Sequence, residues 1–180
     1  SYGGDTDLRR LQKGLNALTP RDIVVKRVEL VPDTFDARRD ARSRVYQYQI
    51  WNHPVPSAFY RGFSWHVYDP LNLSPMQEAI RFLEGEHNFA SFQAAGCDAL
   101  HPVRKIYSNS LNGDGDFLVY TVEATAFLRH MVRSIVGTLV EVGRGERSPA
   151  AFAELLQAQD RRLAGPTAPA QGLFLVEVKY

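Results

Sequence analysis

The spacing of hydrophobic and polar residues predicts an amphipathic helix near each end of the chain's first half. Leucines recur at helical intervals over residues 7–18, with basic residues on the opposite face. Asp7 precedes this repeat and is expected to cap the helix. A second apolar stripe covers residues 73–87, where Ser74 and the proline after it predict a helix start and Gly85 predicts its end.

Five other segments have the composition of strands. Residues 43–52 alternate in the way that a half-buried strand requires, and the remaining segments are rich in β-branched and aromatic residues. A tight turn is expected within the sequence NGDG, so the two segments that flank it are predicted to form a β-hairpin. The predicted strands cover residues 22–31, 43–52, 103–111, 116–127 and 172–180.

The most apolar predicted helix covers residues 126–142 and ends at Gly143. On a helix of this length, Arg129 and Arg133 would lie one turn apart at the boundary of the buried face. A boundary arginine buries its aliphatic stem and directs its planar guanidinium toward a carboxylate or a phosphate. An ordinary surface ion pair would leave the same pattern, so spacing alone does not decide between these two interpretations.

The order of these elements predicts the fold class. Residues 148–159 form a further predicted helix with a Ser-Pro start. Helices and strands are mixed without regular βαβ alternation, so we expect an α+β fold (α/β mixed). In this fold a mixed, largely antiparallel sheet has its helices packed on one face.

Composition limits the classes of function. The chain has 180 residues and a formal net charge of +1, so any nucleic-acid surface must come from local clusters of basic residues. Cys97 is the only cysteine, which excludes an internal disulfide and agrees with a reducing cytoplasm. The five histidines lack ligand spacing, so we expect no metal site. No apolar run is long enough to span a bilayer.

Two stretches carry candidate chemistry. Tyr46 and Tyr48 follow a run of arginines in FDARRDARSRVYQY, and arginines beside exposed aromatic rings are typical of RNA binding. Tyrosines that share one face of a strand are, however, more often part of a core. Glu86 and His87 in GEHNFASF could serve acid–base catalysis, although a polar loop after a helix would contain similar residues.

Several short sequence blocks, taken in their order along the chain, resemble the TruA-type tRNA pseudouridine synthases over essentially the whole chain. They are GLNALTPRDIVV, FDAR followed by ARSRVYQYQIWN, GEHNFASF, VRKIY, AFLRHMVRSIVGTLVEVGRG and GPTAPAQGLFLVEVKY. The resemblance implies two α/β halves joined by a continuous sheet with a basic cleft. It also implies a cytoplasmic homodimer that isomerises uridines in the anticodon stem-loop of tRNA. The target base would flip out of its stack, and neither a metal nor an organic cofactor would be needed.

The resemblance also implies roles for individual residues. Tyr46 matches the family's active-site tyrosine, which stacks on the target base. Arg133 matches the arginine that pairs with the catalytic aspartate, a pairing that would keep a carboxylate ionised in a dry cleft. Thr125 and Arg129 depart from the Asn and His that are usual in the family. The residues expected to bind RNA are Arg38, Arg42, Arg44, Arg104, Arg129 and His130.

The family's nucleophilic aspartate is not found in this chain. It belongs to a motif similar to G-R-T-D-A-G-V-H, whereas the Asp7 region has neither the preceding Arg nor the following Gly-Val-His. Asp36 and Asp40 belong to the tyrosine block instead. We therefore expect residues 1–31 to be a remnant of the N-terminal half, residues 32–180 to be the C-terminal domain, and this chain alone to be inactive. The alternative is a tRNA-binding module without catalytic activity.

Overall fold

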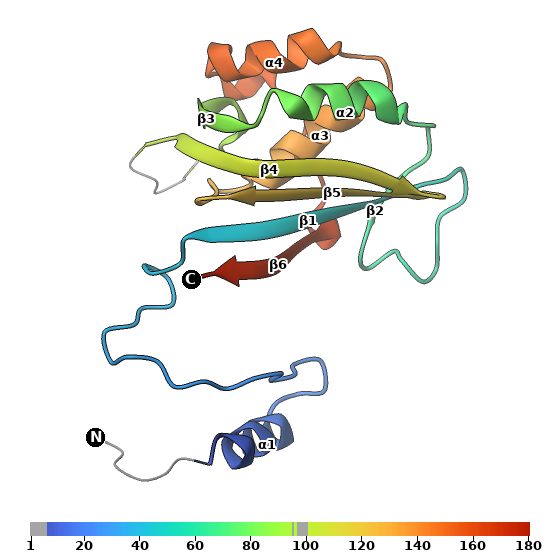
Figure 1. The fold of residues 1–180 in the computed structure, drawn as a ribbon. Helices are drawn as coiled ribbons and strands as arrows, with labels where there is room; N and C mark the ends of the chain where they lie inside the picture. The colour runs from blue at the N-terminus through green and yellow to red at the C-terminus, as the bar shows by residue number, and fades with distance from the viewer. Residues whose placement is uncertain (1–6, 95, 97–100) are drawn as a thin grey trace. The chain divides into compact units, whose positions relative to one another are not determined.

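The computed structural model describes residues 7–94, 96 and 101–180, and the chain divides into two compact units. The first unit covers residues 1–40 and the second covers residues 41–180. The larger unit contains the sheet and all helices except the first one (Figure 1). The candidate chemistry of Tyr46 and Arg133 therefore lies within one unit.

The first unit contains helix α1, which spans Leu8–Leu18 as predicted. Asp7 caps it, because its carboxylate accepts hydrogen bonds from the backbone amides of Arg9 and Arg10 at 3.0 and 3.1 Å. None of the helix residues is buried, and Leu18 is 86% exposed. The apolar stripe that the sequence predicted is thus present on α1 but is largely open.

The predicted strand over residues 22–31 is wrong, because this segment is extended but forms no strand. Side chains of α1 satisfy its backbone instead. The amide group of Asn16 bonds both the N–H and the carbonyl of Val25, at 2.7 and 2.9 Å, and Gln12 donates to the carbonyl of Lys26 at 2.7 Å. The β-branched residues favour extended backbone, but a strand also needs a partner strand, and the first unit supplies none among its described residues.

The second unit is built on a six-stranded sheet with the order β2-β1-β5-β4-β3, to which β6 adds by pairing with β1. Among the strands that the structure describes, only the β1–β2 pair is parallel, so the sheet is mixed and largely antiparallel, as predicted. The strands are β1 (Ser43–Asn52), β2 (Trp65–Val67), β3 (Gly85–Asn88), β4 (Val103–Asp114), β5 (Phe117–Ala124) and β6 (Leu173–Lys179).

The predicted hairpin is confirmed, since β4 and β5 pair through a turn at Gly115, where φ is +57°. No strand was predicted over residues 85–88. They form β3, which pairs with β4 along one edge of the sheet. Gly85 has a φ of +100°, which glycine alone adopts without strain, so it turns the chain from the helix into this strand.

Helices α2 (Leu73–Arg81), α3 (Met131–Gly143) and α4 (Pro149–Ala158) cover one face of the sheet (Figure 1), which confirms the predicted layer arrangement. Ser148 caps α4 as expected. The prediction that Ser74 caps α2 is wrong, because the cap is Asn72, whose side chain accepts from the Ser74 amide at 3.2 Å. The helix also ends at Arg81, four residues before Gly85.

Helix α3 begins later than predicted, at Met131 rather than near residue 126. The residue before it, His130, has left-handed backbone angles (φ 61°, ψ 7°), which break the helical path. Arg129 therefore precedes the helix and does not lie one turn from Arg133 on its surface. Leu128 continues the helical spacing of the apolar residues in α3, so the sequence alone did not reveal this break.

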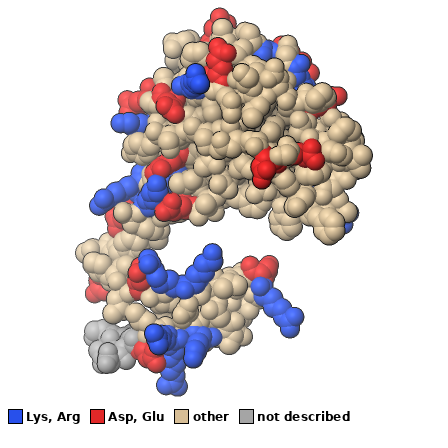
Figure 2. Space-filling view, turned by 45° about the vertical axis from the view of Figure 1, so that its right-hand side comes forward, with Lys and Arg blue, Asp and Glu red and all other residues tan. Residues whose placement is uncertain are grey.

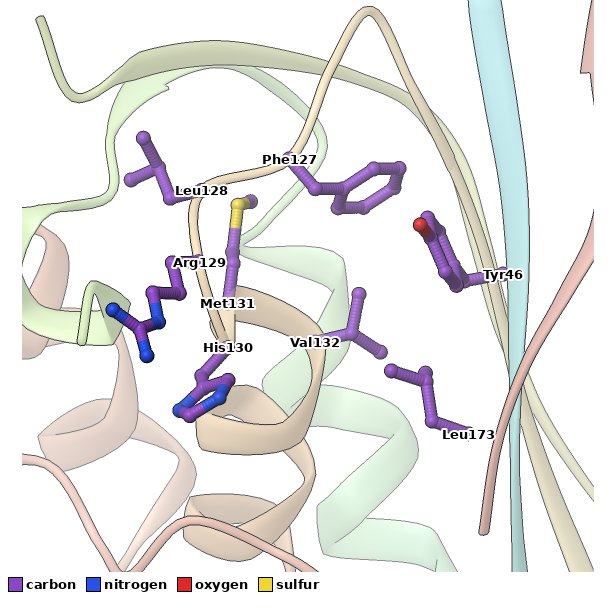
Figure 3. A pocket seen from close by; sticks show the side chains of 8 residues that line it. All are labelled: Tyr46, Phe127, Leu128, Arg129, His130, Met131, Val132 and Leu173. Carbon is purple, nitrogen blue, oxygen red and sulfur yellow. The ribbon is translucent and has the colours of Figure 1, made fainter. Parts of the chain in front are cut away.

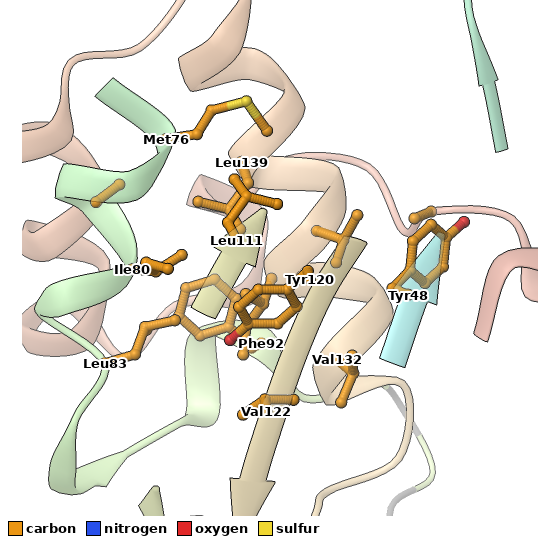
Figure 4. Packing of buried hydrophobic residues seen from close by; sticks show 14 of the residues in the cluster. Tyr48, Met76, Ile80, Leu83, Phe92, Leu111, Tyr120, Val122, Val132 and Leu139 are labelled. Atoms are coloured by element: carbon orange, nitrogen blue, oxygen red, sulfur yellow. The ribbon is translucent and has the colours of Figure 1, made fainter. Parts of the chain in front are cut away.

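The core lies between the sheet and the three helices (Figure 4). Tyr48 and Tyr120 are fully buried, as are Phe92 and Leu139. Each fully buried large apolar side chain contributes roughly 1.5–3 kcal/mol relative to its exposed state. This packing holds α3 against β1 and so fixes the positions of the residues that form the candidate site.

Candidate functional site

A pocket of about 230 Å³ opens where β1, the start of α3 and β6 meet. This volume lies below the roughly 300–1,000 Å³ of pockets for drug-sized ligands and suits a single ring. Figure 3 shows Tyr46 at one end, Arg129 and His130 at the other, and apolar side chains between them. The lining residues are Tyr46, Phe127, Leu128, Arg129, His130, Met131, Val132 and Leu173.

Strand β1 places Tyr46 on the helix-covered side of the sheet. Tyr48 and Ile50 point the same way and are fully buried or nearly so, whereas Tyr46 is only partly buried. Its ring meets Phe127 edge-on, with 5.0 Å between the ring centroids. The β1–β6 register shifts between Val45 and Tyr46, and such irregularities turn a side chain locally. The two tyrosines thus have different surroundings: Tyr48 belongs to the core, and Tyr46 forms a wall of the pocket.

Arg129 and His130 form the polar end of the pocket, where the Arg129 guanidinium supplies a positive charge. Arg129 is exposed and donates from Nη1 to the Gly96 carbonyl at 3.2 Å. Burial lowers the pKa of His130, and the positive charges of Arg133 and Arg129 lower it further. A left-handed histidine is an uncommon backbone state, and strained residues of this kind often occur at functional sites. The pocket therefore combines a stacking surface with positive charge, which suits an anionic, ring-containing ligand.

Arg133 lies in the first turn of α3 and does not line the pocket itself. Its Nε donates to the Ala168 carbonyl at 2.6 Å. Among the described residues, no hydrogen-bond acceptor contacts the two terminal nitrogens of its guanidinium. Burial raises the pKa of Tyr48, and the positive charge of Arg133 opposes that rise. This geometry leaves a two-nitrogen fork available for a planar anion.

Of the other predicted RNA-binding arginines, those in the second unit do not line the pocket. Arg38 belongs to the first unit. In the second unit, Arg42 directly precedes β1 and Arg44 is its second residue. Arg44 donates to the carbonyls of Ala41 and Thr125 at 3.0 and 2.8 Å. Arg104 donates to backbone carbonyls at the start of β4. On the face of the larger unit that Figure 2 shows, basic and acidic side chains are interspersed.

Local hydrogen bonds occupy the three aspartates that the sequence offered as substitutes for a nucleophile. Asp7 caps α1, and Asp36 accepts from the amides of Arg38 and Arg39, both at 2.8 Å. These two amide bonds lower the pKa of Asp36. Asp40 accepts from the Asp36 amide at 2.9 Å. No carboxylate lines the pocket in the described part of the chain.

The remaining candidates also lie outside the pocket. Glu86 and His87 are in β3, where His87 Nε2 bonds the Glu84 carbonyl at 2.8 Å. The sequence did not single out Phe127, Leu173 or Ala168, because each is an ordinary apolar residue. Within the described ranges, no group of metal-ligating side chains could hold an ion, and no helix is long and apolar enough to cross a membrane.

Comparison with known proteins identifies the family. The sequence profile of a family described as tRNA pseudouridine synthase matches residues 79–180. The chain belongs to the tRNA pseudouridine synthase family. Proteins named tRNA pseudouridine synthase A are 46% identical in Myxococcus xanthus, over 93% of this chain, and 43% identical in Bordetella parapertussis, over 98% of it. A relative of the same name in Vibrio parahaemolyticus is 45% identical over 93% of the chain.

The relatives are longer than this member of the tRNA pseudouridine synthase family. The chain spans 63% of the Myxococcus protein and 67% of the Bordetella protein. Membership confirms the resemblance that the sequence blocks indicated. The roles of Tyr46 and Arg133 remain predictions.

Proposed function

We propose that the protein of which this sequence is a part isomerises uridines of tRNA to pseudouridine. One observation carries the proposal: in a chain of this family, Tyr46 forms the wall of a ring-sized pocket, and Arg133 directly follows the lining residue Val132 in the first turn of α3. Relatives named tRNA pseudouridine synthase A support it. The substrate would be uridines in the anticodon stem-loop, presented to the pocket after base flipping.

Each side chain has a definite part in this reaction. Tyr46 stacks on the flipped base, with Phe127 holding its ring edge-on. Arg133 pairs with the nucleophilic carboxylate and keeps it ionised. In the reaction the C1′–N1 bond breaks, a C1′–C5 bond forms, the C5 hydrogen leaves as a proton and N1 gains one. We propose that the aspartate comes from the part of the protein that the longer relatives contain and this sequence does not.

The partners follow from the same proposal. Arg38, Arg42, Arg44 and Arg104 contact the tRNA backbone. A phosphate near the target nucleotide binds at the polar end of the pocket, where Arg129 supplies the charge and His130 can donate a hydrogen bond. The protein acts in the cytoplasm as a homodimer. A formal net charge of +1 means that these local contacts, rather than bulk charge, supply the attraction.

The test is release of tritium from tRNA labelled at uridine C5, catalysed by the complete gene product that contains this chain. Replacing Tyr46 with Leu removes the stacking surface, so kcat/KM should fall about 10- to 100-fold. Tyr68→Leu is the matched control, since Tyr68 is exposed and does not line the pocket. Equal activity of the Tyr46→Leu variant and the control would contradict the assignment of Tyr46. Absence of release by the unmodified protein would contradict the function itself.

A tRNA-binding module without catalysis is the second candidate. It is favoured for this chain in isolation because no carboxylate lines the pocket in the described residues. Both candidates predict that the isolated chain binds tRNA. They differ for the complete gene product, which releases tritium only if it is a synthase.

A further inference from the structure

The segment of residues 164–172 runs along α3 and is tied to it by backbone hydrogen bonds. At one end, the Gly165 amide donates to the buried Thr138 hydroxyl at 3.0 Å. In the middle, the Ala168 amide donates to the Arg133 carbonyl at 3.0 Å. Residues 164–172, called here the crossing segment, therefore follow one face of the helix and reach the turn that carries Arg133.

Glycine at position 137 allows this close approach. A Cβ atom at Gly137 would lie 1.7 Å from the Pro166 carbonyl oxygen, which no packing arrangement tolerates. Alanine usually stabilises a helix interior by about 1 kcal/mol relative to glycine, so the sequence gives up helix propensity at this point. What it gains is a crossing segment that rests directly on the backbone of α3.

The other end of the crossing segment is held from the sheet. The Tyr48 hydroxyl, on β1, donates to the Pro169 carbonyl at 2.6 Å. A Cβ atom at Gly172 would lie 2.7 Å from the Tyr48 ring, so the glycine lets the chain pass close to the tyrosine. Arg161 adds three bonds near the start of the segment, to the carbonyls of Ala164 and Gly165 and to the Thr167 hydroxyl.

The held segment acts on Arg133 through the Ala168 carbonyl, which accepts from Nε at 2.6 Å. An arginine side chain otherwise loses up to about 2 kcal/mol of rotamer freedom when it is ordered. Fixing Nε in advance orients the guanidinium plane and leaves both terminal nitrogens for a carboxylate. A fork that is already oriented does not bear this ordering cost when the reaction complex forms.

We propose that the crossing segment is a positioning element for Arg133, and that Tyr48, acting through Pro169, is its key positioning residue. The proposal rests on the proposed function only for its catalytic consequence. The structural part, that Tyr48 controls the freedom of the Arg133 guanidinium, stands on the contacts above. It concerns a tyrosine that is buried in the core and does not line the pocket.

The structural part is tested by hydrogen exchange at the Arg133 Nε–H in the complete gene product. Arginine side-chain NMR signals are recorded, and the Arg133 signal is the one that Arg133→Lys removes. Tyr48→Phe should accelerate exchange at this site about tenfold, because the carbonyl that accepts the bond is no longer held. The matched control is Tyr120→Phe, since Tyr120 is also fully buried and lies opposite Tyr48 on the neighbouring strand. It should leave the exchange rate unchanged.

The catalytic part is tested by tritium release with the same variants. Tyr48→Phe should lower kcat about 10-fold while KM for tRNA changes less than about twofold, since small misplacements of a catalytic group affect the chemical step. In an Arg133→Lys background, Tyr48→Phe should have no further effect on kcat, because the two residues act as one unit. If Tyr48 had a purely structural role, the kcat of the double variant would instead fall by the product of the two single-variant losses.

Folding of each variant is checked by circular dichroism. Thr138→Val, which removes the hydroxyl that accepts from Gly165, replaces Tyr48→Phe if the latter does not fold. Unchanged Nε–H exchange in a folded Tyr48→Phe or Thr138→Val variant would overturn the proposal, as would multiplicative losses in the double variant. If the unmodified protein releases no tritium, the proposed function fails, and the exchange measurement still decides whether the segment positions Arg133.

Discussion

Two buried tyrosines that face each other across β1 and β5 should respond in opposite ways to the loss of their hydroxyl groups. Tyr48 and Tyr120 are register partners, and both side chains are fully buried. The Tyr48 hydroxyl donates to the Pro169 carbonyl at 2.6 Å, whereas the Tyr120 hydroxyl has no hydrogen-bond partner among the described residues. Phenylalanine removes one oxygen atom in each case and keeps the ring in place.

The expected magnitudes follow from hydrogen-bond energetics. Tyr48→Phe removes a bond worth roughly 0.5–1.5 kcal/mol and leaves the Pro169 carbonyl without its partner, so the free energy of unfolding should fall by about 1–2 kcal/mol. Tyr120→Phe removes a desolvated hydroxyl, so the free energy of unfolding should stay constant or rise by up to about 1 kcal/mol. Burial and the charge of Glu84 raise the pKa of Tyr120, which shows that its surroundings disfavour the ionised hydroxyl.

Urea unfolding followed by tryptophan fluorescence measures both values. Trp65 is a suitable probe, since its ring centroid lies 6.5 Å from that of Tyr48. The two variants should differ by about 2 kcal/mol, or by about 4–8 °C in melting temperature for a domain of this size. Equal losses for both variants, or a larger loss for Tyr120→Phe, would refute the hydrogen-bond assignment on which the role of Tyr48 depends.

Other substitutions test separate parts of the structure. Gly14→Ala should raise the free energy of unfolding of α1 by about 1 kcal/mol, because a methyl group there meets no atom within 4 Å. Thermal melts followed by circular dichroism measure this change, and a lower free energy of unfolding would mean that this face of the helix is covered. Hydrogen bonds from Lys179 and Ser43 hold the pKa of Glu123 below its ordinary value of 4.5, so its stabilising contribution is present above that pH and is lost as pH falls through the lower folded-state pKa. Glu123→Gln should therefore flatten the acid limb of a stability–pH curve, and an unchanged limb would contradict the pairing. The pKa of His130 is lowered from 6.5, so the unfolded state binds the proton more strongly and stability should decline as pH falls below that value. His130→Asn keeps a residue that tolerates left-handed angles and should abolish this decline in urea titrations, whereas a decline of the same size would assign it to another group.

The elements that the sequence predicted well have strong local signals. Strand β1 matches its predicted bounds, and Ser148 and Asp7 cap their helices as expected. The alternation expected over residues 43–52 agrees with the burial of Tyr48 and Ile50 on one face of β1. In each case the residues that decide the element lie within a few positions of one another, so no tertiary contact was needed to interpret them.

The errors occurred where a distant contact decides the outcome. Residues 22–31 have strand composition but bond to side chains of α1. The start of α3 depends on the left-handed backbone of His130, which apolar periodicity hides. Ala168, which binds the Arg133 Nε, is 35 residues away in sequence and carries no chemical signal of its own. The sequence thus indicated Tyr46 and Arg133 through family resemblance, while the parts that orient Arg133 required the structure.

The central claim is that this chain carries the stacking tyrosine and the carboxylate-binding arginine of a tRNA pseudouridine synthase without its nucleophile. Tritium release from tRNA labelled at uridine C5, measured with the 180-residue chain alone, tests this claim most directly. We predict binding of tRNA in a gel-shift assay without release, because the aspartates offered by the sequence are occupied by local hydrogen bonds. Release above background would contradict the claim and would assign the nucleophile to an aspartate within this chain, with Asp7, Asp36 and Asp40 the first to replace.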